Sequence, residues 1–459
     1  MSLWTAKEIA AATGGTASED FAIESLSIDT RSLETGALFV PLKDARDGHD
    51  FIPGAREAGA GAVLSEYTDE IAPALIVDDT LAALRALAIA ARTRSDAVRI
   101  AVTGSVGKTS LKEAISTICQ GQGKTHKSLK SFNNHWGVPL TLAAMPSGTQ
   151  YGIFEAGMNH AGELADLSPL IAPDIAVITK IAPAHLAHFK DIDAIAAAKA
   201  EIFEGVVDGG AAVLNADDDY FGYLSGMAQK RGLKIVTFGK DQSADVRITS
   251  CAVTPGHISA DLVIDGAVYA LRMGLDGQHW LTNGACAVAA AMAAGIDPQK
   301  SIDRLEAFGA LPGRGERLSL NIEGKAVTVI DESYNANPES MRAAIAMLEN
   351  SKGRTLAVLG DMFELGAGEL EHHVDLAIPL AAAGVARVIV TGECMRVLRG
   401  ALPQTMRGPW ASGAEHALAA LIHELQDGDT VLIKGSNATG LSGLVAQLKK
   451  YKKEIAHVV

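Results

Sequence analysis

The sequence predicts an α/β protein with three domains, two of which are built on mainly parallel sheets. Three observations favour this fold class. The length of 459 residues corresponds to about three domains. Apolar, strand-like runs alternate with helical stretches over residues 97–312, and the alternation begins again at about residue 315. Hydrophobic residues make up 48% of the chain, which is enough for several cores.

A small α/β domain is expected over residues 1–80. A short helix is predicted from Thr5 to Ala12, and residues 25–42 alternate like strands around a turn. A second helix over 51–60 precedes two apolar strands at 62–65 and 74–77. The run Asp78-Asp79-Thr80 supplies capping side chains for a helix from Leu81 to Arg94, which leads into the next domain.

The central domain is expected over residues 81–312. Strands are predicted at 98–103, 151–155, 175–179 and 211–214, with helical stretches between them, as in a parallel, doubly wound sheet. Residues 244–275 contain short alternating strands without a helix, which indicates a small antiparallel sheet.

A Rossmann-like α/β domain is expected over residues 313–459, after a linker at Leu311-Pro312-Gly313-Arg314-Gly315. Its strands are predicted at 326–330, 355–359, 387–391 and 430–433. No GxGxxG run follows any of these strands, which argues against a dinucleotide site.

Charge and cysteine usage limit the class of protein. A formal net charge of −14 argues against nucleic acid or an anionic membrane as the main partner. The four cysteines lie far apart and show no metal-binding spacing, which favours free thiols in a reducing cytosol. We see no signal peptide, and we interpret the apolar stretch 277–296 as a buried helix rather than a membrane span. The expectation is a monomeric, cytoplasmic protein.

The stretch from Ile100 to Gln120 carries the strongest functional signal. An apolar strand leads into a glycine turn, and an amphipathic helix begins at Lys108. Such a turn lets the backbone surround a polyphosphate, while the lysine adds a positive charge and the hydroxyl of Thr109 can ligate Mg²⁺. The strict P-loop pattern has a further glycine where Val102 stands, so the match is to the shorter variant T-G-x-x-G-K-T. The predicted nucleotide-binding residues of this loop are Gly104, Ser105, Val106, Gly107, Lys108, Thr109 and Ser110.

Other polar clusters lie at the ends of predicted strands, where open α/β sheets bind ligands. Each also has a structural explanation. Glu155 follows a strand and could hold a divalent ion or could be a surface glutamate; His185 could be a loop histidine; Lys199 could be a solvated lysine of an amphipathic helix. Further clusters of this kind lie at 277–283, 331–338, 360–362 and 434–436.

Taken in order, these motifs resemble those of the Mur ligase family, and the resemblance covers nearly the whole chain. The matching runs are T-G-S-V-G-K-T-S at 103–110, E-A-G-M-N-H-A-G-E at 155–163, A-H-L at 184–186, A-A-A-K-A-E-I-F at 196–203, L-N-A-D-D at 214–218, P-G-R at 312–314, D-E-S-Y-N-A-N-P-E-S-M at 331–341, G-D-M-F-E-L-G at 360–366 and K-G-S at 434–436.

The resemblance implies site residues in all three domains. The first domain would hold a uridine nucleotide through the S-x-D-T-R run, with Ser27, Thr30 and Arg31 as its contacts. The central domain would bind ATP, with one Mg²⁺ held by Thr109 and Glu155 and a second by His185 and a carbamylated Lys199. Lys108, Lys199 and His185 would be catalytic. The remaining implied contacts are Arg314 and Asp331 for the nucleotide and Asn134, Tyr334 and Asn337 for the substrates.

One motif departs from the family. The usual H-N-x-x-N run near the adenine reads His279-Trp280-Leu281-Thr282-Asn283 here. His279 and Asn283 remain the adenine-region residues implied by the resemblance, and Trp280, in place of an asparagine, would stack rather than hydrogen-bond.

The implied activity is ATP-dependent amide-bond formation through an acyl phosphate. The Y-N-A-N-P-x-S-M run is typical of the member that adds D-alanyl-D-alanine (D-Ala-D-Ala) to UDP-N-acetylmuramoyl-tripeptide (UDP-MurNAc-tripeptide). The diaminopimelate- or lysine-adding relative would carry D-N-P-[RA], which is absent. That relative and a folylpolyglutamate synthase are the nearest alternative enzymes. A P-loop switch protein is a further alternative, but a GTPase would carry an N-K-x-D run for guanine, and residues 215–218 lack its lysine. A sugar-nucleotide binding module is the last alternative, and it would leave Lys108 and Thr109 without a role.

Overall fold

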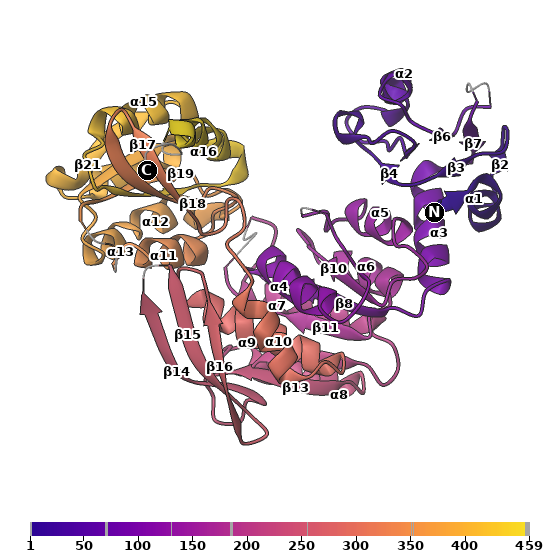
Figure 1. The fold of residues 1–459 in the computed structure, drawn as a ribbon, viewed down its shortest axis with the longest axis horizontal. Coiled ribbons are helices and arrows are strands. Elements are labelled where there is room, and N and C mark those ends of the chain that lie inside the picture. The colour runs from indigo at the N-terminus through magenta and orange to yellow at the C-terminus, as the bar shows by residue number, and fades with distance from the viewer. Residues whose placement is uncertain are drawn as a thin grey trace.

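The structure is a computed structural model that describes residues 2–68, 72–129, 131–183, 187–254, 256–349, 351 and 353–454. These residues form three main sheets, and each sheet is drawn from one stretch of the chain. Figure 1 shows the indigo N-terminal part and the orange-to-yellow C-terminal part on opposite sides of the central part. The α/β class and the three-part architecture predicted from the sequence are confirmed.

The N-terminal part is built on a five-stranded sheet of order β2-β7-β6-β5-β4. The helix predicted from Thr5 is present, and Thr5 and Glu8 cap it reciprocally. Asp79 caps α3 as expected. The elements are β1 (Trp4–Thr5), α1 (Ala6–Thr13), β2 (Thr16–Ala17), β3 (Ala22–Ile23), β4 (Leu26–Ser27), β5 (Leu38–Phe39), α2 (Ile52–Glu57), β6 (Ala62–Ser65), β7 (Ala74–Ile76) and α3 (Thr80–Thr93).

The central part contains a nine-stranded sheet of order β16-β15-β14-β13-β12-β11-β8-β10-β9. Strands β8 to β13 pair in parallel, as the alternating pattern predicts. The elements are β8 (Val98–Thr103), α4 (Lys108–Gln120), β9 (Thr125–Lys127), α5 (Gly137–Ala143), β10 (Tyr151–Glu155), α6 (Glu163–Ile171), β11 (Ile175–Ile178), α7 (Ile192–Ala200), β12 (Ala211–Asn215), α8 (Phe221–Lys230), β13 (Lys234–Gly239), β14 (Val246–Thr254), β15 (His257–Ile264), β16 (Ala267–Met273), α9 (His279–Ala293) and α10 (Pro298–Glu306).

The expected antiparallel strands are present but do not form a separate sheet. Strand β14 pairs in parallel with β13 through Phe238↔Val246 and Gly239↔Arg247, and β15 and β16 follow in antiparallel order. This pairing satisfies the backbone groups that would otherwise be exposed along the edge of β13.

Alternate residues of β8 pack into two cores on opposite faces of the central sheet. Ile100 and Val102 contribute to the core that includes α4 and the alanine-rich α9, whereas Ala101 contributes to the core that includes α6 and α7. The stretch 277–296 therefore contains the buried helix that the sequence predicts, α9, over His279–Ala293. Among the described helices, none has the length and apolar character that a membrane span requires.

The C-terminal part has a six-stranded sheet of order β17-β18-β22-β19-β20-β21, in which β17 alone is antiparallel to its neighbour. Gly313 and Gly315 take positive φ values of 73° and 83° where the chain bends into this sheet. The elements are β17 (Glu316–Ile322), β18 (Lys325–Glu332), α11 (Pro338–Ala346), β19 (Thr355–Gly360), α12 (Glu369–Val374), α13 (Ala377–Ala382), β20 (Arg387–Thr391), α14 (Glu393–Ala401), β21 (Arg407–Ala411), α15 (Ala414–Glu424), β22 (Thr430–Lys434) and α16 (Leu441–Leu448).

The N-terminal part is attached firmly to the central part. The indole N–H of Trp4 donates to the carbonyl of Ala143 at 2.8 Å, and the guanidinium carbon of Arg94 lies 3.4 Å from the centroid of the Trp4 ring. Helix α3 also packs along α5. The C-terminal part instead follows a glycine-containing linker, and Figure 1 shows α11 on its side that faces the central part.

Candidate active site

A cavity of about 810 Å³ lies between the central and C-terminal parts. The P-loop, the ends of β10 and β11 and the start of α9 form one wall. The linker and the segment that leads into α11 form the other wall. The sequence-predicted residues that line it are Ser105, Val106, Gly107, Lys108, Thr109, Ser110, Glu155, His279, Asn283, Arg314, Tyr334 and Asn337.

The P-loop has the strand-turn-helix geometry that the sequence predicts. Gly104 has a φ of 143°, and a Cβ atom at this position would lie 1.8 Å from Oγ1 of Thr179. Gly107, with a φ of 84°, precedes the first turn of α4. The N–H of Ser105 donates to the carbonyl of Lys180 at 2.8 Å, and the Thr179 hydroxyl donates to the carbonyl of Val106 at 2.5 Å. The segment after β11 therefore fixes the shape of the turn.

Lys108 begins α4 and points back over its own turn. Its Nζ donates to the carbonyl of Gly104 at 2.8 Å. Burial lowers the pKa of Lys108, the negative charge of Glu155 raises it in part, and Arg314 lowers it further. An ammonium group held at the turn by one carbonyl can transfer to a phosphate oxygen, because phosphate is the stronger acceptor.

Glu155 has the features of a metal ligand. Its side chain is 1% exposed, and its Oε1 accepts a hydrogen bond of 2.7 Å from the side-chain amide of Asn133. Its Oε2 is buried and has no hydrogen-bond partner in the part of the chain that the structure describes. A buried, unpartnered carboxylate oxygen is costly unless a cation or donor satisfies it. Together with the hydroxyl of Thr109 in the same cavity, this oxygen fits a Mg²⁺ ion, which prefers oxygen ligands.

Lys199 is a buried lysine near the end of α7 and is 1% exposed. Burial lowers its pKa well below the ordinary value, and the charge of Lys108 lowers it further. The solvated alternative from the sequence is thus wrong. Lys199 is not among the residues that line the cavity. The predicted partner His185 lies outside the described residues, as do Ala184 and Leu186.

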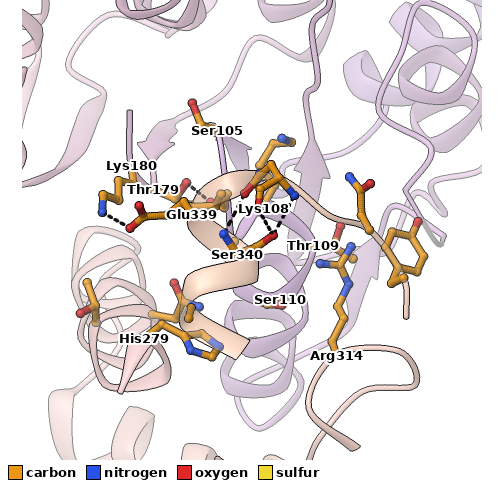
Figure 2. Close-up of a pocket in the computed structure, with 18 of the residues that line it drawn as sticks. Ser105, Lys108, Thr109, Ser110, Thr179, Lys180, His279, Arg314, Glu339 and Ser340 are labelled. Carbon is orange, nitrogen blue, oxygen red and sulfur yellow. Dashed lines mark hydrogen bonds and ion pairs between the residues drawn. The ribbon is translucent and has the colours of Figure 1, made fainter. Parts of the chain in front are cut away.

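The C-terminal wall contributes the segment from Tyr334 to Ser340. The Tyr334 hydroxyl is hydrogen-bonded to Oγ of Ser131, and the guanidinium carbon of Arg314 lies 4.1 Å from the centroid of the Tyr334 ring. Asn337 caps α11 and shares a reciprocal cap with Ser340. These contacts place one aromatic and one cationic side chain opposite the P-loop, as Figure 2 shows for Arg314.

Trp280, which departs from the H-N-x-x-N run, packs in the core at the edge of the cavity. Trp280 is 1% exposed, and its ring centroid lies 5.5 Å from that of Phe308 in the core of the central part. His279 lines the cavity, and burial lowers its pKa. Asn283 approaches the P-loop, since its Oδ1 lies 3.2 Å from where a Cβ of Gly107 would be. In this structure, packing in the core occupies most of the surface of Trp280.

Several predicted residues make other contacts within the protein. Both carboxylate oxygens of Asp331 accept hydrogen bonds, one from the N–H of Gly313 and one from Ser333, so this side chain braces the linker. Asn134 accepts from the N–H groups of Trp136 and Gly137 at the start of α5. Neither residue lines the cavity. Their roles as ligand contacts stay predictions.

The three residues implied for the uridine nucleotide lie together in the N-terminal part, away from the cavity. Ser27 ends β4, and Thr30 and Arg31 follow in a 3-10 turn. The guanidinium of Arg31 is 88% exposed and makes an ion pair of 2.7 Å with Asp29. This arrangement holds the arginine on the surface, where it can meet an anionic ligand.

In the described residues, the clusters at 360–362 and 434–436 both hold neighbouring segments in place. Asp361 accepts from the N–H groups of Cys394 and Met395 and so caps α14. Lys434 is 2% exposed and donates to the carbonyl of Asn335 at 2.7 Å, which braces the segment before α11. Lys434 also contributes to the cavity wall.

Sequence reasoning did not nominate several residues of the cavity wall. Asn133 precedes the nominated Asn134, Thr179 ends a predicted strand and Lys180 follows it, so position alone could have flagged them. Glu332 and Glu339 flank the nominated Tyr334 and Asn337. No sequence signal pairs these residues across the two parts of the chain.

Comparisons with known proteins agree on the family. The model described as "Mur ligase middle domain" matches residues 102–291, and the one described as "Mur ligase, glutamate ligase domain" matches residues 313–437. The chain belongs to the Mur ligase family. The expectation drawn from the motifs is thereby confirmed.

Individual relatives of this Mur ligase match over nearly its whole length. It is 34% identical over 435 residues to the UDP-N-acetylmuramoyl-tripeptide–D-alanyl-D-alanine ligase of Escherichia coli (strain K12), which is 94% of this chain and 95% of that protein. A crystal structure of MurF from Acinetobacter baumannii is similar with a TM-score of 0.85 and 29% identity, covering 97% of this chain and 99% of that one. MurF from Thermotoga maritima, solved in complex with ADP, shares the fold with a TM-score of 0.77 and 24% identity, over 94% and 99% of the two chains.

Proposed function

We propose that this Mur ligase joins D-Ala-D-Ala to UDP-MurNAc-tripeptide and converts ATP to ADP and phosphate. The observation that carries the proposal is the pairing of two motifs across one cavity: the P-loop lies on one wall and the Tyr334–Asn337 run lies on the other. The full-length similarity to enzymes with this name supports the choice of substrates.

An amide bond does not form from a carboxylate and an amine without activation, so the reaction needs two steps. A terminal carboxylate oxygen of the tripeptide attacks the γ-phosphorus, and the bond from that phosphorus to the β-phosphate oxygen breaks, which releases ADP. The dipeptide amine nitrogen then attacks the carbonyl carbon of the acyl phosphate and loses a proton. Phosphate leaves, and the new amide remains.

The first step brings two anions together, so cationic groups must surround the reacting phosphate. Lys108 supplies one charge at the turn, and Arg314 supplies another from the opposite wall. Thr109 and Glu155 would hold one Mg²⁺, and His185 and a carbamylated Lys199 would hold a second, as the family implies. Bound Mg²⁺ would neutralise phosphate charge. Ser105, Val106, Gly107 and Ser110 offer backbone and hydroxyl groups to the phosphates.

The remaining roles follow the positions of the side chains. His279 and Asn283 would contact the adenine beside Gly107, and Tyr334 and Asn337 would line the peptide pocket. Ser27, Thr30, Arg31 and Asn134 would contact the uridine-linked substrate. Asp331, which accepts a hydrogen bond from the N–H of Gly313 in the linker, would contact the nucleotide.

A phosphate-release assay with UDP-MurNAc-tripeptide tests the proposal. Phosphate release should depend on D-Ala-D-Ala and not on diaminopimelate, lysine or glutamate. Lys108→Ala should abolish it while the circular dichroism spectrum stays that of the parent protein. Release that proceeds without any acceptor would favour a nucleotide switch, and a preference for another amino acid would favour a different ligase.

A further inference from the structure

The side-chain N–H of Trp280 is a buried donor without an acceptor. Trp280 is the second residue of α9, is 1% exposed and belongs to the residues that line the cavity. Its Nε1 has no hydrogen-bond partner in the part of the chain that the structure describes. A buried donor destabilises the folded chain unless an acceptor replaces the water it has lost. A ligand in the cavity can supply that acceptor.

Aromatic neighbours hold the Trp280 ring, and its N–H lies beside the linker. The ring centroid is 5.5 Å from that of Phe308 and 5.7 Å from that of His279. A Cβ atom at Gly315 would lie 3.7 Å from Nε1. Gly315 has a φ of 83° and no side chain, so the space next to the indole N–H stays open.

A carboxylate oxygen without a donor lies beside the same space. The Cβ position of Gly315 is also 3.5 Å from Oε1 of Glu332, which lines the cavity too. The other oxygen, Oε2, pairs with Nζ of the buried Lys434 at 3.5 Å. Among the described residues, none donates a hydrogen bond to Oε1. One donor and one acceptor therefore border this space, and both lack a partner.

A ligand group that satisfies both must accept one hydrogen bond and donate another. A hydroxyl group does this with a single oxygen atom. The nucleotide of the proposed function carries such groups on its ribose. His279, the neighbour of Trp280, would contact the adenine, and Arg314, the neighbour of Gly315, would face the phosphates. The ribose joins the adenine to the phosphates, so it would lie between these two contacts.

We propose that Trp280 and Glu332 together bind one ribose hydroxyl of the nucleotide. The indole N–H donates to the hydroxyl oxygen, and the hydroxyl donates to Oε1 of Glu332. This inference rests on the proposed function, because it takes the cavity as the nucleotide site. It gives Trp280 a hydrogen-bonding role in addition to the stacking that the sequence resemblance implies. The two residues make the site selective for ribonucleotides, since a missing hydroxyl leaves both groups unpaired.

Isothermal titration calorimetry with ADP, 2′-deoxyADP and 3′-deoxyADP in Mg²⁺ buffer measures this selectivity. The parent protein should bind ADP at least about threefold more tightly than one of the two deoxy analogues. Trp280→Phe keeps an aromatic ring and removes the N–H. It should therefore bind ADP roughly three- to tenfold more weakly than the parent and bind that analogue as the parent does. A smaller ring that only loosens the core would weaken all three ligands by the same factor.

A second variant tests the acceptor, and a third provides the control. Glu332→Gln keeps the shape of the side chain but loses the charge that strengthens the hydrogen bond, so it should lower the same preference for ADP. The matched control is Trp410→Phe, which removes an indole N–H that donates to the carbonyl of Gly392 at 3.0 Å, outside the cavity. All three dissociation constants of the control should equal those of the parent.

The outcomes separate the ribose contact from the proposed function. If the parent protein binds none of the three ligands, the proposed function fails and the ribose contact fails with it. If the parent binds all three equally, the ribose contact alone is refuted, even where Trp280→Phe does not fold. A parental ratio of ADP to analogue affinity in folded Trp280→Phe or in Glu332→Gln would refute the part assigned to that residue.

Discussion

Asn133 and Glu155 are joined by a hydrogen bond of 2.7 Å that decides which oxygen of the glutamate is left for a ligand. The amide of Asn133 occupies Oε1, and Oε2 has no hydrogen-bond partner among the residues that the structure describes. The main-chain N–H of Glu155 donates to Oγ of Ser128 at 3.1 Å, which fixes the residue at the end of β10. One buried carboxylate oxygen therefore has no hydrogen-bond partner among the described residues and is free to accept a cation.

Asn133→Ala should raise the Mg²⁺ concentration needed for half-maximal phosphate release by roughly 10- to 100-fold, because the carboxylate loses the donor that orients it. Activity should recover at high Mg²⁺. Asn321→Ala is the matched control: it removes the hydrogen bond of 2.9 Å that the Asn321 side chain accepts from the N–H of Gly324, away from the cavity, and it should leave the Mg²⁺ requirement unchanged. An unaltered Mg²⁺ titration for Asn133→Ala would show that this amide does not position a metal ligand.

Lys199 should become a metal ligand only after its side-chain amine has reacted with CO₂ to form a carbamate. Burial lowers the pKa of Lys199, so more of it is the neutral amine that can bond to the carbon of CO₂ and release a proton. Lys199→Ala should lose at least about 100-fold in activity, and short carboxylic acids should restore part of it. The exposed Lys230 at the end of α8 gives the control, since Lys230→Ala should keep full activity. Full activity of Lys199→Ala without added acid would reject the carbamate.

Elements with local sequence signals could be predicted closely. The helix expected to begin at Lys108 spans Lys108–Gln120, and the cap expected from the acidic run at 78–80 is Asp79. Short strands with few apolar residues were missed, such as β9 (Thr125–Lys127), whose three residues pair along the edge of the sheet. The joining of β14 to β13 was also missed, because edge pairing depends on packing rather than on local pattern.

In the candidate site too, local motifs could be predicted from the sequence and long-range contacts could not. The P-loop, Glu155 and the run around Tyr334 could be found because each motif is contiguous in the sequence. The contacts that bring the walls together could not be found, since Ser131 and Tyr334 are 203 residues apart and neither one predicts the other. The hydrogen bond between the Asp331 carboxylate and the N–H of Gly313 is likewise a contact that only the folded chain reveals.

Gly104→Ala should disrupt the phosphate-binding turn. A Cβ atom there would lie 1.8 Å from Oγ1 of Thr179, at a φ of 143° that L-residues rarely adopt. We expect a loss of roughly 1–3 kcal/mol in the free energy of unfolding and loss of nucleotide binding. Gly226→Ala is the control: this glycine lies inside α8 with nothing within 4 Å of its Cβ position, so the change should stabilise by about 0.4–1 kcal/mol. Urea unfolding measures the free energy of unfolding, and calorimetry measures nucleotide binding. Equal changes in the two variants would contradict a strained turn at Gly104.

Cys119 should resist modification until the protein unfolds. Its side chain is 0% exposed in α4, and burial raises the pKa of its thiol from 9.0 to about 12. The folded protein therefore keeps a proton that the unfolded chain releases above pH 9, so the free energy of unfolding should fall as the pH rises from about 9 toward 12. Cys119→Ala should show a smaller fall in the free energy of unfolding between pH 8 and pH 10, measured by urea unfolding.

Alkylation tests the burial of Cys119 directly: at pH 8, iodoacetamide should modify the exposed Cys251 within the native protein and leave Cys119 intact. Equal rates of modification at the two sites would show that the core around α4 opens far more often than its packing implies.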